Sequence, residues 1–487
     1  MLTRAIGRVR IPVSRIQGSN NSSGFLKDSK LGPIGVSCRR WLSIESGKRF
    51  AAMWGSGDYG RLGLGNLDSQ WTPAVCSALS DHSIRAVACG GAHTLFLTGR
   101  RIVLTVELRN AENWHLNDFA EIESFAAMIL MVLAANNLIS AVSDCQLTHV
   151  TETRRVFATG LNDCGQLGVS DVKSHAMDPL EVSGLDKDIL HISAGYYHSA
   201  AITVDGELYM WGKNSSGQLG LGKKAARVVR VPTKVQALHG ITIQSVALGS
   251  EHSVAVTDGG EVLSWGGGGS GRLGHGHQSS LFGILRSNSE FTPRLIKELE
   301  GIKVKNVAAG LLHSACTDEN GSAFMFGERS INKMGFGGVR NATTPSIISE
   351  VPYAEEVACG GYHTCVVTRG GELYTWGSNE NGCLGTDSTY VSHSPVRVEG
   401  PFLESTVSQV SCGWKHTAAI SDNKVFTWGW GGSHGTFSVD GHSSGGQLGH
   451  GSDVDYARPA MVDLGKNVGA VHISCGFNHT AAVLEHF

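Results

Sequence analysis

The chain has 487 residues, a formal net charge of −3 and 17% charged residues, and 64 of its residues are glycine, well above the roughly 7% of an average protein. This glycine content excludes an ordinary helical protein. The longest uninterrupted apolar run, residues 125–135, is shorter than the ~18 to 20 residues that cross a bilayer, so we expect no membrane span. The 11 cysteines include no CxxC pair and no Cys/His spacing typical of a zinc site.

The N-terminal segment, residues 1–43, carries eight basic side chains and one acidic side chain, Asp28, among several serines. Such a segment without an apolar core is typical of an organelle import presequence rather than a secretory signal. Residues Arg40–Ser43 resemble a mitochondrial cleavage site. We therefore predict a cleaved, disordered presequence for the mitochondrial matrix, with a chloroplast address or a plain basic tail as alternatives. The remaining chain has a formal charge of about −10, so its bulk field repels nucleic-acid phosphates.

Beyond the presequence, one unit recurs seven times. Its first mark is a glycine, two variable residues, a histidine and then Ser or Thr. A Trp-Gly pair followed by a Gly-x-Leu-Gly turn is the second mark, and a proline ten or more residues later is the third. The period averages about 56 residues, close to the ~50 of one class of propeller blade. The motif histidines are His93, His198, His252, His313, His363, His416 and His479.

Local composition indicates β-structure within each unit. Short segments such as Ser199–Thr203 and Glu207–Trp211 flank Asp205–Gly206, a dipeptide that favours a tight hairpin turn. Repeated short strands are best buried radially around an axis, so we predict an all-β, seven-bladed β-propeller. The first Trp-Gly strand, Arg49–Trp54, lacks the strand that precedes it in other copies, and the chain ends on an unpartnered strand, Ile473–Leu484. We expect these N- and C-terminal strands to pair and close the ring.

The repeated Trp-Gly, Gly-x-Leu-Gly and Gly-x-x-His-Ser/Thr marks resemble those of the regulator of chromosome condensation repeat family, over residues 48–487. The resemblance implies a seven-bladed propeller and is greatest to plant mitochondrial members. It implies a non-enzymatic scaffold or adaptor for organelle gene expression, through splicing of transcripts for respiratory complex I or through ribosome assembly. The alternative that it implies is guanine-nucleotide exchange on a small GTPase. We expect no catalytic residues, cofactor or metal.

The first repeat is interrupted at its hairpin turn. His93 and Thr159 are 66 residues apart, whereas the matching positions of intact copies, such as His198 and Trp211, are 13 apart. The excess of 53 residues, 99–151, includes an apolar stretch, Met128–Leu133, with the composition of a short helix. It is either a partner-binding excursion or sequence from an unspliced transcript. We favour the unspliced sequence, and sequencing the transcript distinguishes the two.

Two loops supply candidate contacts with partners, since loops on a rigid scaffold commonly carry recognition. One contains the densest basic run of the mature chain, five bases in twelve residues without an acid, which is either a solvated loop or a contact for RNA or an acidic protein. The other is the long loop after Trp428. The candidate residues are Lys223, Lys224, Arg227, Arg230 and Lys234 in the first loop, and Ser433, His434 and Phe437 in the second.

The motif histidines recur with the repeat, so we interpret them as structural residues that perform one packing or hydrogen-bonding task seven times, rather than as metal ligands or acid-base catalysts. The same reasoning makes the cysteines that precede some motif glycines small buried residues. Only Gly413–Thr417 approximates the repeated Gly-Trp-Arg-His-Thr motif by which a relative senses ultraviolet-B light, so we do not expect photoreception. The cysteines are Cys89, Cys359, Cys412 and Cys475.

Overall fold

The computed structural model describes residues 48–99, 102–108, 145–151, 154–170, 174–276, 289–328, 342–432 and 445–487. The predicted presequence and the helix expected at Met128–Leu133 lie outside these residues. The chain divides into two compact units, of which Lys48–Gly99 with Thr153–Phe487 forms the larger. In the smaller unit, β5 (Ile102–Leu108) pairs antiparallel with β6 (Cys145–Thr151). Among the described residues, no helix is long and apolar enough to cross a membrane.

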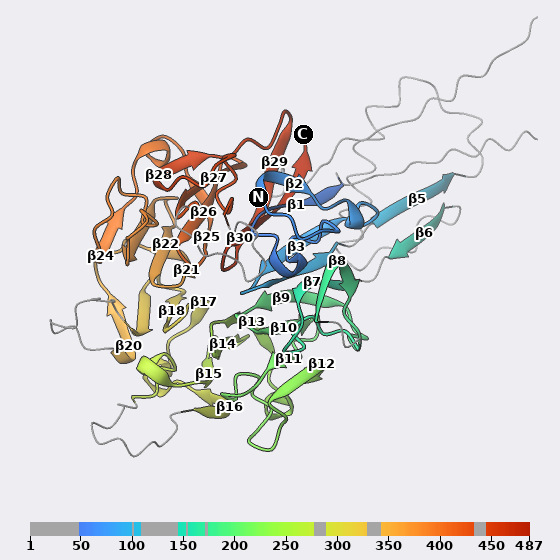
Figure 1. Cartoon of the computed structure of the whole chain (residues 1–487). Helices are drawn as coiled ribbons and strands as arrows, with labels where there is room; N and C mark the ends of the chain where they lie inside the picture. The colour runs from blue at the N-terminus through green and yellow to red at the C-terminus, as the bar shows by residue number, and fades with distance from the viewer. Residues whose placement is uncertain are drawn as a thin grey trace, which may run out of the picture. The chain divides into compact units, whose positions relative to one another are not determined.

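The larger unit consists of seven four-stranded antiparallel sheets arranged as the blades of a propeller (Figure 1). This confirms the predicted all-β, seven-bladed fold. In order of their strands, the blades are β3 (Ile84–Cys89), β4 (His93–Thr98), β7 (Val156–Leu161), β8 (His175–Glu181); β9 (Ile189–Ala194), β10 (His198–Thr203), β11 (Leu208–Lys213), β12 (Val228–Lys234); β13 (Ile243–Leu248), β14 (His252–Thr257), β15 (Val262–Gly266), β16 (Glu290–Leu295); β17 (Val304–Ala309), β18 (His313–Asp318), β19 (Ala323–Gly327), β20 (Ala342–Ile348); β21 (Ala354–Cys359), β22 (His363–Thr368), β23 (Leu373–Gly377), β24 (Ser392–Arg397); β25 (Val407–Cys412), β26 (His416–Ser421), β27 (Lys424–Gly429), β28 (Tyr456–Met461); and β29 (Val468–Cys475), β30 (His479–His486), β1 (Arg49–Gly55), β2 (Gln70–Val75).

The last blade closes the ring with strands from both ends of the described propeller. β1 lies between β2 and β30, and its register with β30 runs without a break from Arg49 opposite Glu485 to Gly55 opposite His479. The Arg49 guanidinium also donates a hydrogen bond of 3.0 Å to the Glu485 carboxylate. The predicted pairing of the N- and C-terminal strands is therefore confirmed.

The residue types in a strand depend on whether the strand is the first, second, third or fourth of its blade. All six residues of the second strand are buried in β10 and β14, because this strand packs against neighbouring blades on both sides. The fourth strand is at the outer edge, where proline is tolerated because one side of the strand needs no ladder hydrogen bond. The repeat prolines all lie in fourth strands: Pro73, Pro179, Pro232, Pro293, Pro345, Pro395 and Pro459.

Short 3-10 helices occur in the connections. Most follow the fourth strand of a blade and bury one large apolar side chain, such as Leu238 or Phe402, beneath the start of the next blade. This recurring apolar residue gives each connection a fixed path. The helices are η1 (Asp58–Gly60), η2 (Ser77–Leu79), η4 (Gln236–Leu238), η5 (Gly269–Gly271), η6 (Lys297–Leu299) and η7 (Gly400–Leu403).

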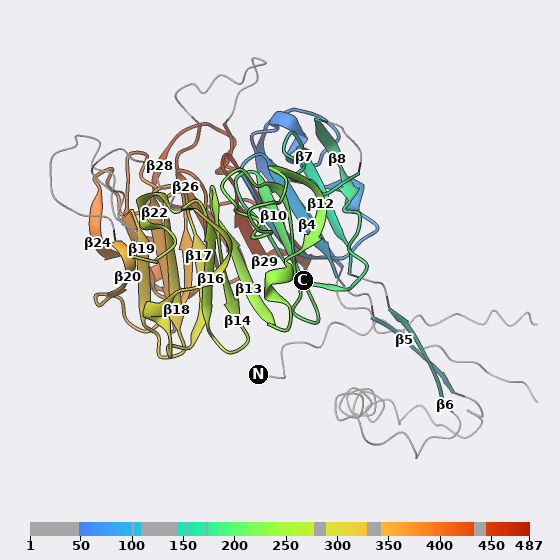
Figure 2. The same ribbon diagram turned by 90° about the horizontal axis from the view of Figure 1, so that it is seen from below.

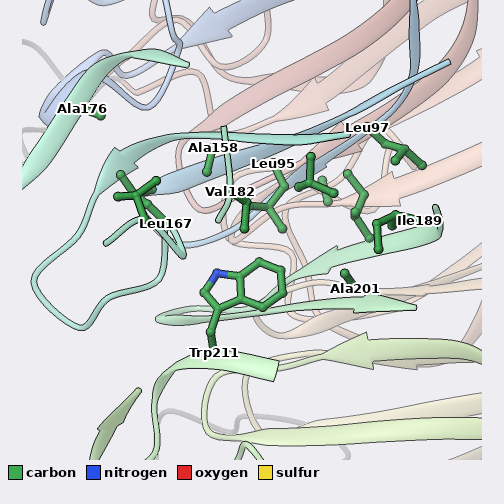
Figure 3. Packing of buried hydrophobic residues seen from close by; sticks show 13 residues of the cluster. Leu95, Leu97, Ala158, Leu167, Ala176, Val182, Ile189, Ala201 and Trp211 are labelled. Atoms are coloured by element: carbon green, nitrogen blue, oxygen red, sulfur yellow. The ribbon is translucent and has the colours of Figure 1, made fainter. Parts of the chain in front are cut away.

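The core consists of apolar layers between successive blades, and in three of the described blades the repeat tryptophan links the layer to a turn. Figure 3 shows the Trp211 indole extending from β11 toward Leu95, Leu167 and Val182. Its Nε1 donates a hydrogen bond of 2.8 Å to the carbonyl oxygen of Gln166, in the Gly-x-Leu-Gly turn of the preceding blade. Trp265 donates in the same way to a turn carbonyl, at 2.9 Å. The Trp-Gly and Gly-x-Leu-Gly marks therefore belong to one contact between blades.

The interrupted first repeat still forms a complete blade. β4 pairs directly with β7, with Leu97 opposite Val156, although the two residues are separated by the long insertion in the sequence. An insertion at a hairpin turn is tolerated because it lengthens a surface connection without disturbing the strands.

The motif glycines lie where blades are in closest contact, and this predicts the effect of a single methyl group. A Cβ at Gly249 would lie 2.2 Å from Cε1 of His252 and 2.5 Å from the carbonyl oxygen of Gly310 in the next blade. We expect Gly249→Ala to lower the free energy of unfolding by about 1–3 kcal/mol, as overpacked cores do, measured by urea unfolding. Gly259→Ala is the control, because the nearest atom to its Cβ is 3.6 Å away. An unchanged urea midpoint for Gly249→Ala would contradict this account of the interface.

Candidate functional site

The propeller strands run between two faces (Figure 2). In an antiparallel four-stranded blade, the loop from the first to the second strand and the loop from the third to the fourth strand emerge at the same end. The first loop carries the Gly-x-x-His motif and the second carries the Gly-x-Leu-Gly turn. We call the face formed by both sets of loops the motif face.

A ring of hydrogen bonds joins all seven blades just below the motif face. Each motif histidine is buried, and its Nε2 lies within hydrogen-bond distance of the Ser or Thr hydroxyl that follows the motif histidine of the next blade. The ring includes the blade that closes the propeller. The pairs are His93–Ser199 at 2.9 Å, His198–Ser253 at 3.3 Å, His252–Ser314 at 2.9 Å, His313–Thr364 at 3.0 Å, His363–Thr417 at 2.9 Å, His416–Thr480 at 3.0 Å and His479–Thr94 at 2.9 Å.

The hydroxyls determine which nitrogen of each ring carries the proton. Ser199 Oγ donates its proton to the carbonyl oxygen of Gln166 at 2.7 Å, and Ser253 Oγ donates to Gln218 at 2.8 Å. Because a hydroxyl has only one proton, it accepts the bond from the histidine, so Nε2 is protonated and Nδ1 is not. Burial lowers the pKa of His93 to about 3, so this imidazole is neutral at physiological pH. A neutral, fixed histidine of this kind suits a structural link between blades better than proton transfer.

A row of aromatic side chains crosses the motif face. The ring of Trp414 stacks on Phe477 with centroids 4.2 Å apart and planes 12° apart, and Phe477 meets the edge of Tyr196 at 5.3 Å. Trp414, at one end of the row, also contacts a cation, since the Lys415 ammonium lies 4.7 Å from the centroid of its ring. These side chains occupy the variable positions of the Gly-x-x-His loops, so the repeat pattern gave no signal for them. The row presents a packed, half-buried apolar surface.

The structure separates the five residues of the basic run. Lys223, Lys224 and Arg227 are exposed in the loop between β11 and β12, on the motif face. Arg230 is exposed on β12, and its guanidinium donates a 3.4 Å bond to a backbone carbonyl. Lys234 lies at the far end of the same strand, where its Nζ is 2.7 Å from a carboxylate oxygen of Glu207. Three of the five bases thus lie together in one motif-face loop.

The other candidate loop residues, Ser433, His434 and Phe437, lie outside the residues that the structure describes. Among the described residues, one group of His and Cys side chains is close enough to share a metal ion. A ring nitrogen of His363 and the sulfurs of Cys365 and Cys412 lie within 4.8 Å of one another. No local spacing in the sequence indicates this group, because Cys412 is distant from the other two residues along the chain.

Comparison with known proteins agrees with this architecture. A family model described as the RCC1-like domain matches residues 42–282 and 141–482. The ultraviolet-B receptor UVR8 of Arabidopsis thaliana is 34% identical over 335 residues, which are 68% of this chain and 70% of the receptor. The mitochondrial RCC1 domain-containing protein RUG3 of Arabidopsis thaliana is 32% identical over 305 residues, 60% of this chain. The match covers 62% of RUG3, less than two thirds of that relative.

Solved structures share the fold at lower identity. Human WBSCR16 superposes with a TM-score of 0.66 and 22% identity, covering 90% of this chain and 99% of that protein. Prp20p of Saccharomyces cerevisiae superposes with a TM-score of 0.66 and 19% identity, covering 91% of this chain and 92% of Prp20p. The matched family model, the seven repeats and the closed seven-bladed ring lead to one conclusion: this chain belongs to the RCC1-like propeller family.

Proposed function

We propose that the chain is a non-enzymatic scaffold in mitochondria that supports organelle gene expression, binding protein partners and RNA through its motif face. The processes in question are transcript splicing for respiratory complex I and assembly of the organelle ribosome. RUG3 supports the compartment, because that relative is described as mitochondrial. The arginine-rich segment 1–43 supports the same compartment, because its composition is that of a presequence.

The observation that carries the proposal is the position of the basic loop. Without residues 1–43 the chain has a formal charge of about −10, yet Lys223, Lys224 and Arg227 lie exposed in one loop of the motif face. A local cluster of bases on an acidic protein attracts a polyanion only at that cluster, since charge effects decay over about 8 Å at physiological ionic strength. This arrangement suits a contact made at one edge of a ligand that is otherwise held by other surfaces.

A charge-reversal variant tests this assignment. We expect Lys223→Glu, Lys224→Glu and Arg227→Glu together to reduce the binding of the purified mature protein to organelle RNA or to organelle RNA-processing proteins at least tenfold, because three attractions become repulsions. Binding is measured by fluorescence anisotropy for RNA and by pull-down for proteins. The control carries the same charge change at exposed lysines outside the motif face, Lys297→Glu, Lys303→Glu and Lys466→Glu. Equal losses in both variants would remove the basic loop from the account.

Guanine-nucleotide exchange on a small GTPase is the second candidate function. Prp20p favours it, because the structural study of that protein describes its binding to Gsp1p and histones. An exchange factor of this kind stabilises the nucleotide-free GTPase, so excess GTP releases the complex. Capture of a GTPase that survives RNase and is lost with excess GTP would support exchange over the scaffold role.

A further inference from the structure

Two sulfurs and an imidazole meet at the interface between the β21–β24 blade and the β25–β28 blade. His363 and Cys365 are alternate residues of β22 and therefore project from the same side of that strand. Cys412 is the last residue of β25 in the neighbouring blade. The three side chains are buried, and their donor atoms lie within 4.8 Å of one another.

The hydrogen-bond ring prepares His363 as a ligand. Its Nε2 lies 2.9 Å from Oγ1 of Thr417, and this hydroxyl donates its own proton to the carbonyl oxygen of Cys383 at 2.8 Å. Nε2 therefore carries the proton, and Nδ1 has a free lone pair. Histidines that bind metals usually donate their second ring N–H to a protein group in this way, which fixes the ring and the tautomer. Thr417 supplies that second contact here.

The spacing suits a small thiophilic ion. Zinc binds sulfur at about 2.3 Å and histidine nitrogen at about 2.0–2.1 Å, so two sulfurs that share an ion are at most about 4.6 Å apart. Three donors that surround one such ion lie about 3.3–4.0 Å apart, so donors within 4.8 Å of one another reach this arrangement by shortening their separations by up to about 1 Å.

The repeat shows that the second sulfur is not needed for packing. Cysteines end the first strand of other blades as well, but they pack in the same core clusters as an alanine of the neighbouring blade: Cys475 with Ala418, and Cys89 with Ala481. Among the residues that the structure describes, the position of Cys365 in the second strand is alanine in four other blades. Those alanines are Ala200, Ala315, Ala418 and Ala481.

We propose that His363, Cys365 and Cys412 bind one thiophilic closed-shell cation, Zn²⁺ or Cu(I), which links the two blades. Thiolate and imidazole ligands select both ions over harder cations. Binding forms two metal–sulfur bonds and one metal–nitrogen bond and releases the two thiol protons to solvent. With Zn²⁺ the two thiolates make the metal and its ligands neutral, whereas with Cu(I) they leave one negative charge on the buried site, so charge balance favours Zn²⁺ of the two ions.

Metal titration of the purified propeller tests the site. The full chain is stripped of metal under reducing conditions and then titrated with Zn²⁺ or with Cu(I) against a competing chelator. We expect one ion per chain by elemental analysis and a rise in melting temperature with either ion, because a ligand that binds only the folded state stabilises it. Co²⁺ is expected to give a thiolate charge-transfer band. Saturation by Zn²⁺ alone or by Cu(I) alone supports the site and identifies the ion.

Two variants separate the site from general thiol binding. Cys365→Ala restores the repeat's own residue, so it should fold, and we expect it to lose at least 100-fold in affinity. Cys89→Ala removes a thiol from the same repeat position as Cys412 and should bind as the parent does. Failure of the parent to bind either ion would overturn the proposal. Equal binding by parent and Cys365→Ala would overturn it, as would a Cys365–Cys412 disulfide in the parent isolated without reductant.

Discussion

A chain without residues 471–487 is expected to be unfolded at 25 °C and therefore to show no cooperative unfolding transition. The deletion takes away β30 and most of β29, which together bury side chains such as Ile473, Val483 and Leu484. Each large aliphatic side chain contributes about 1.5–3 kcal/mol when buried, and a whole domain is stable by about 5–15 kcal/mol. The deletion also leaves β1 without its inner neighbour, which opens the ring. Circular dichroism and thermal melting measure the result.

The control for this deletion removes Phe487 alone. That residue is 56% exposed and follows the end of β30, so its loss should change the melting temperature by no more than a few degrees. A thermal melt of the longer deletion that matches the parent would refute closure by the terminal strands.

The histidine ring is expected to make the propeller unfold as the pH falls from 6.5 toward 5. Burial lowers the pKa of His93, His198, His363 and His416 to about 3 and that of His313 to about 4. Burial also lowers the pKa of the remaining two ring members well below its ordinary value. Each of these seven imidazoles is therefore neutral in the folded protein over a pH range in which the same histidine of the unfolded chain, with a pKa near 6.5, binds a proton.

The sign of the effect follows from proton binding. A group whose folded pKa is depressed binds more protons when unfolded, so stability is greatest above pH 6.5 and falls as the pH is lowered toward the folded pKa. Each histidine costs about 1.4 kcal/mol per pH unit in this range, so the ring costs about 10 kcal/mol by pH 5.5, comparable with the stability of a domain. We expect an acid transition between about pH 5 and 6, measured by fluorescence and thermal melting across pH 5 to 8.

A matched pair of variants assigns the acid transition to the ring. His252→Gln keeps an N–H donor near Ser314 but does not titrate. Burial also lowers the pKa of His191 and His472, outside the ring, to about 4, so nine histidines share most of the pH dependence and we expect this variant to make it shallower by about one ninth. His393 is exposed outside the ring, and His393→Gln should leave the dependence unchanged. A melting temperature of the parent that stays constant from pH 7.5 to 5 would contradict the assignment of neutral, buried histidines.

The fold was predictable because the contacts that build it repeat. Trp211 and the turn that contains Gln166 belong to different units, yet the same bond recurs in other blades, so both partners appear in the sequence as fixed marks. Closure of the ring was predictable from the order of the repeated marks alone. The first Trp-Gly strand lacks the strand that precedes it in other units, and the last strand has no following partner in the sequence. The insertion at residues 99–151 was predicted for the same reason, since residues on either side of that segment continue the repeat.

The candidate sites were harder to predict because they depend on positions where the repeats differ. Trp414 and Phe477 occupy variable loop positions, and their stacking requires the ring geometry that places neighbouring loops side by side. Cys365 and Cys412 belong to different blades, so no local spacing links them. Lys234 belongs to the basic run in the sequence but lies at the far end of its strand, because a strand of seven residues carries the chain across the blade.

The net charge and the basic loop together limit how the motif face can bind RNA. Most of the surface of an acidic propeller repels phosphate, so RNA binding should depend on few phosphate contacts. The affinity for RNA should then fall only modestly with salt, since each phosphate contact contributes about −0.7 to the slope of log K against log salt concentration. Protein contacts are less constrained, since the row formed by Tyr196, Phe477 and Trp414 is apolar and half-buried. This division of the face suits a scaffold that holds a protein and an RNA at the same time.

Affinity capture of the tagged mature chain from purified mitochondria, with and without RNase, tests the scaffold role most directly. The account predicts organelle transcripts together with splicing or ribosomal proteins, with a part of this set lost on RNase treatment. Capture of a small GTPase that survives RNase and is released by excess GTP, without organelle transcripts, would contradict the scaffold role and favour exchange.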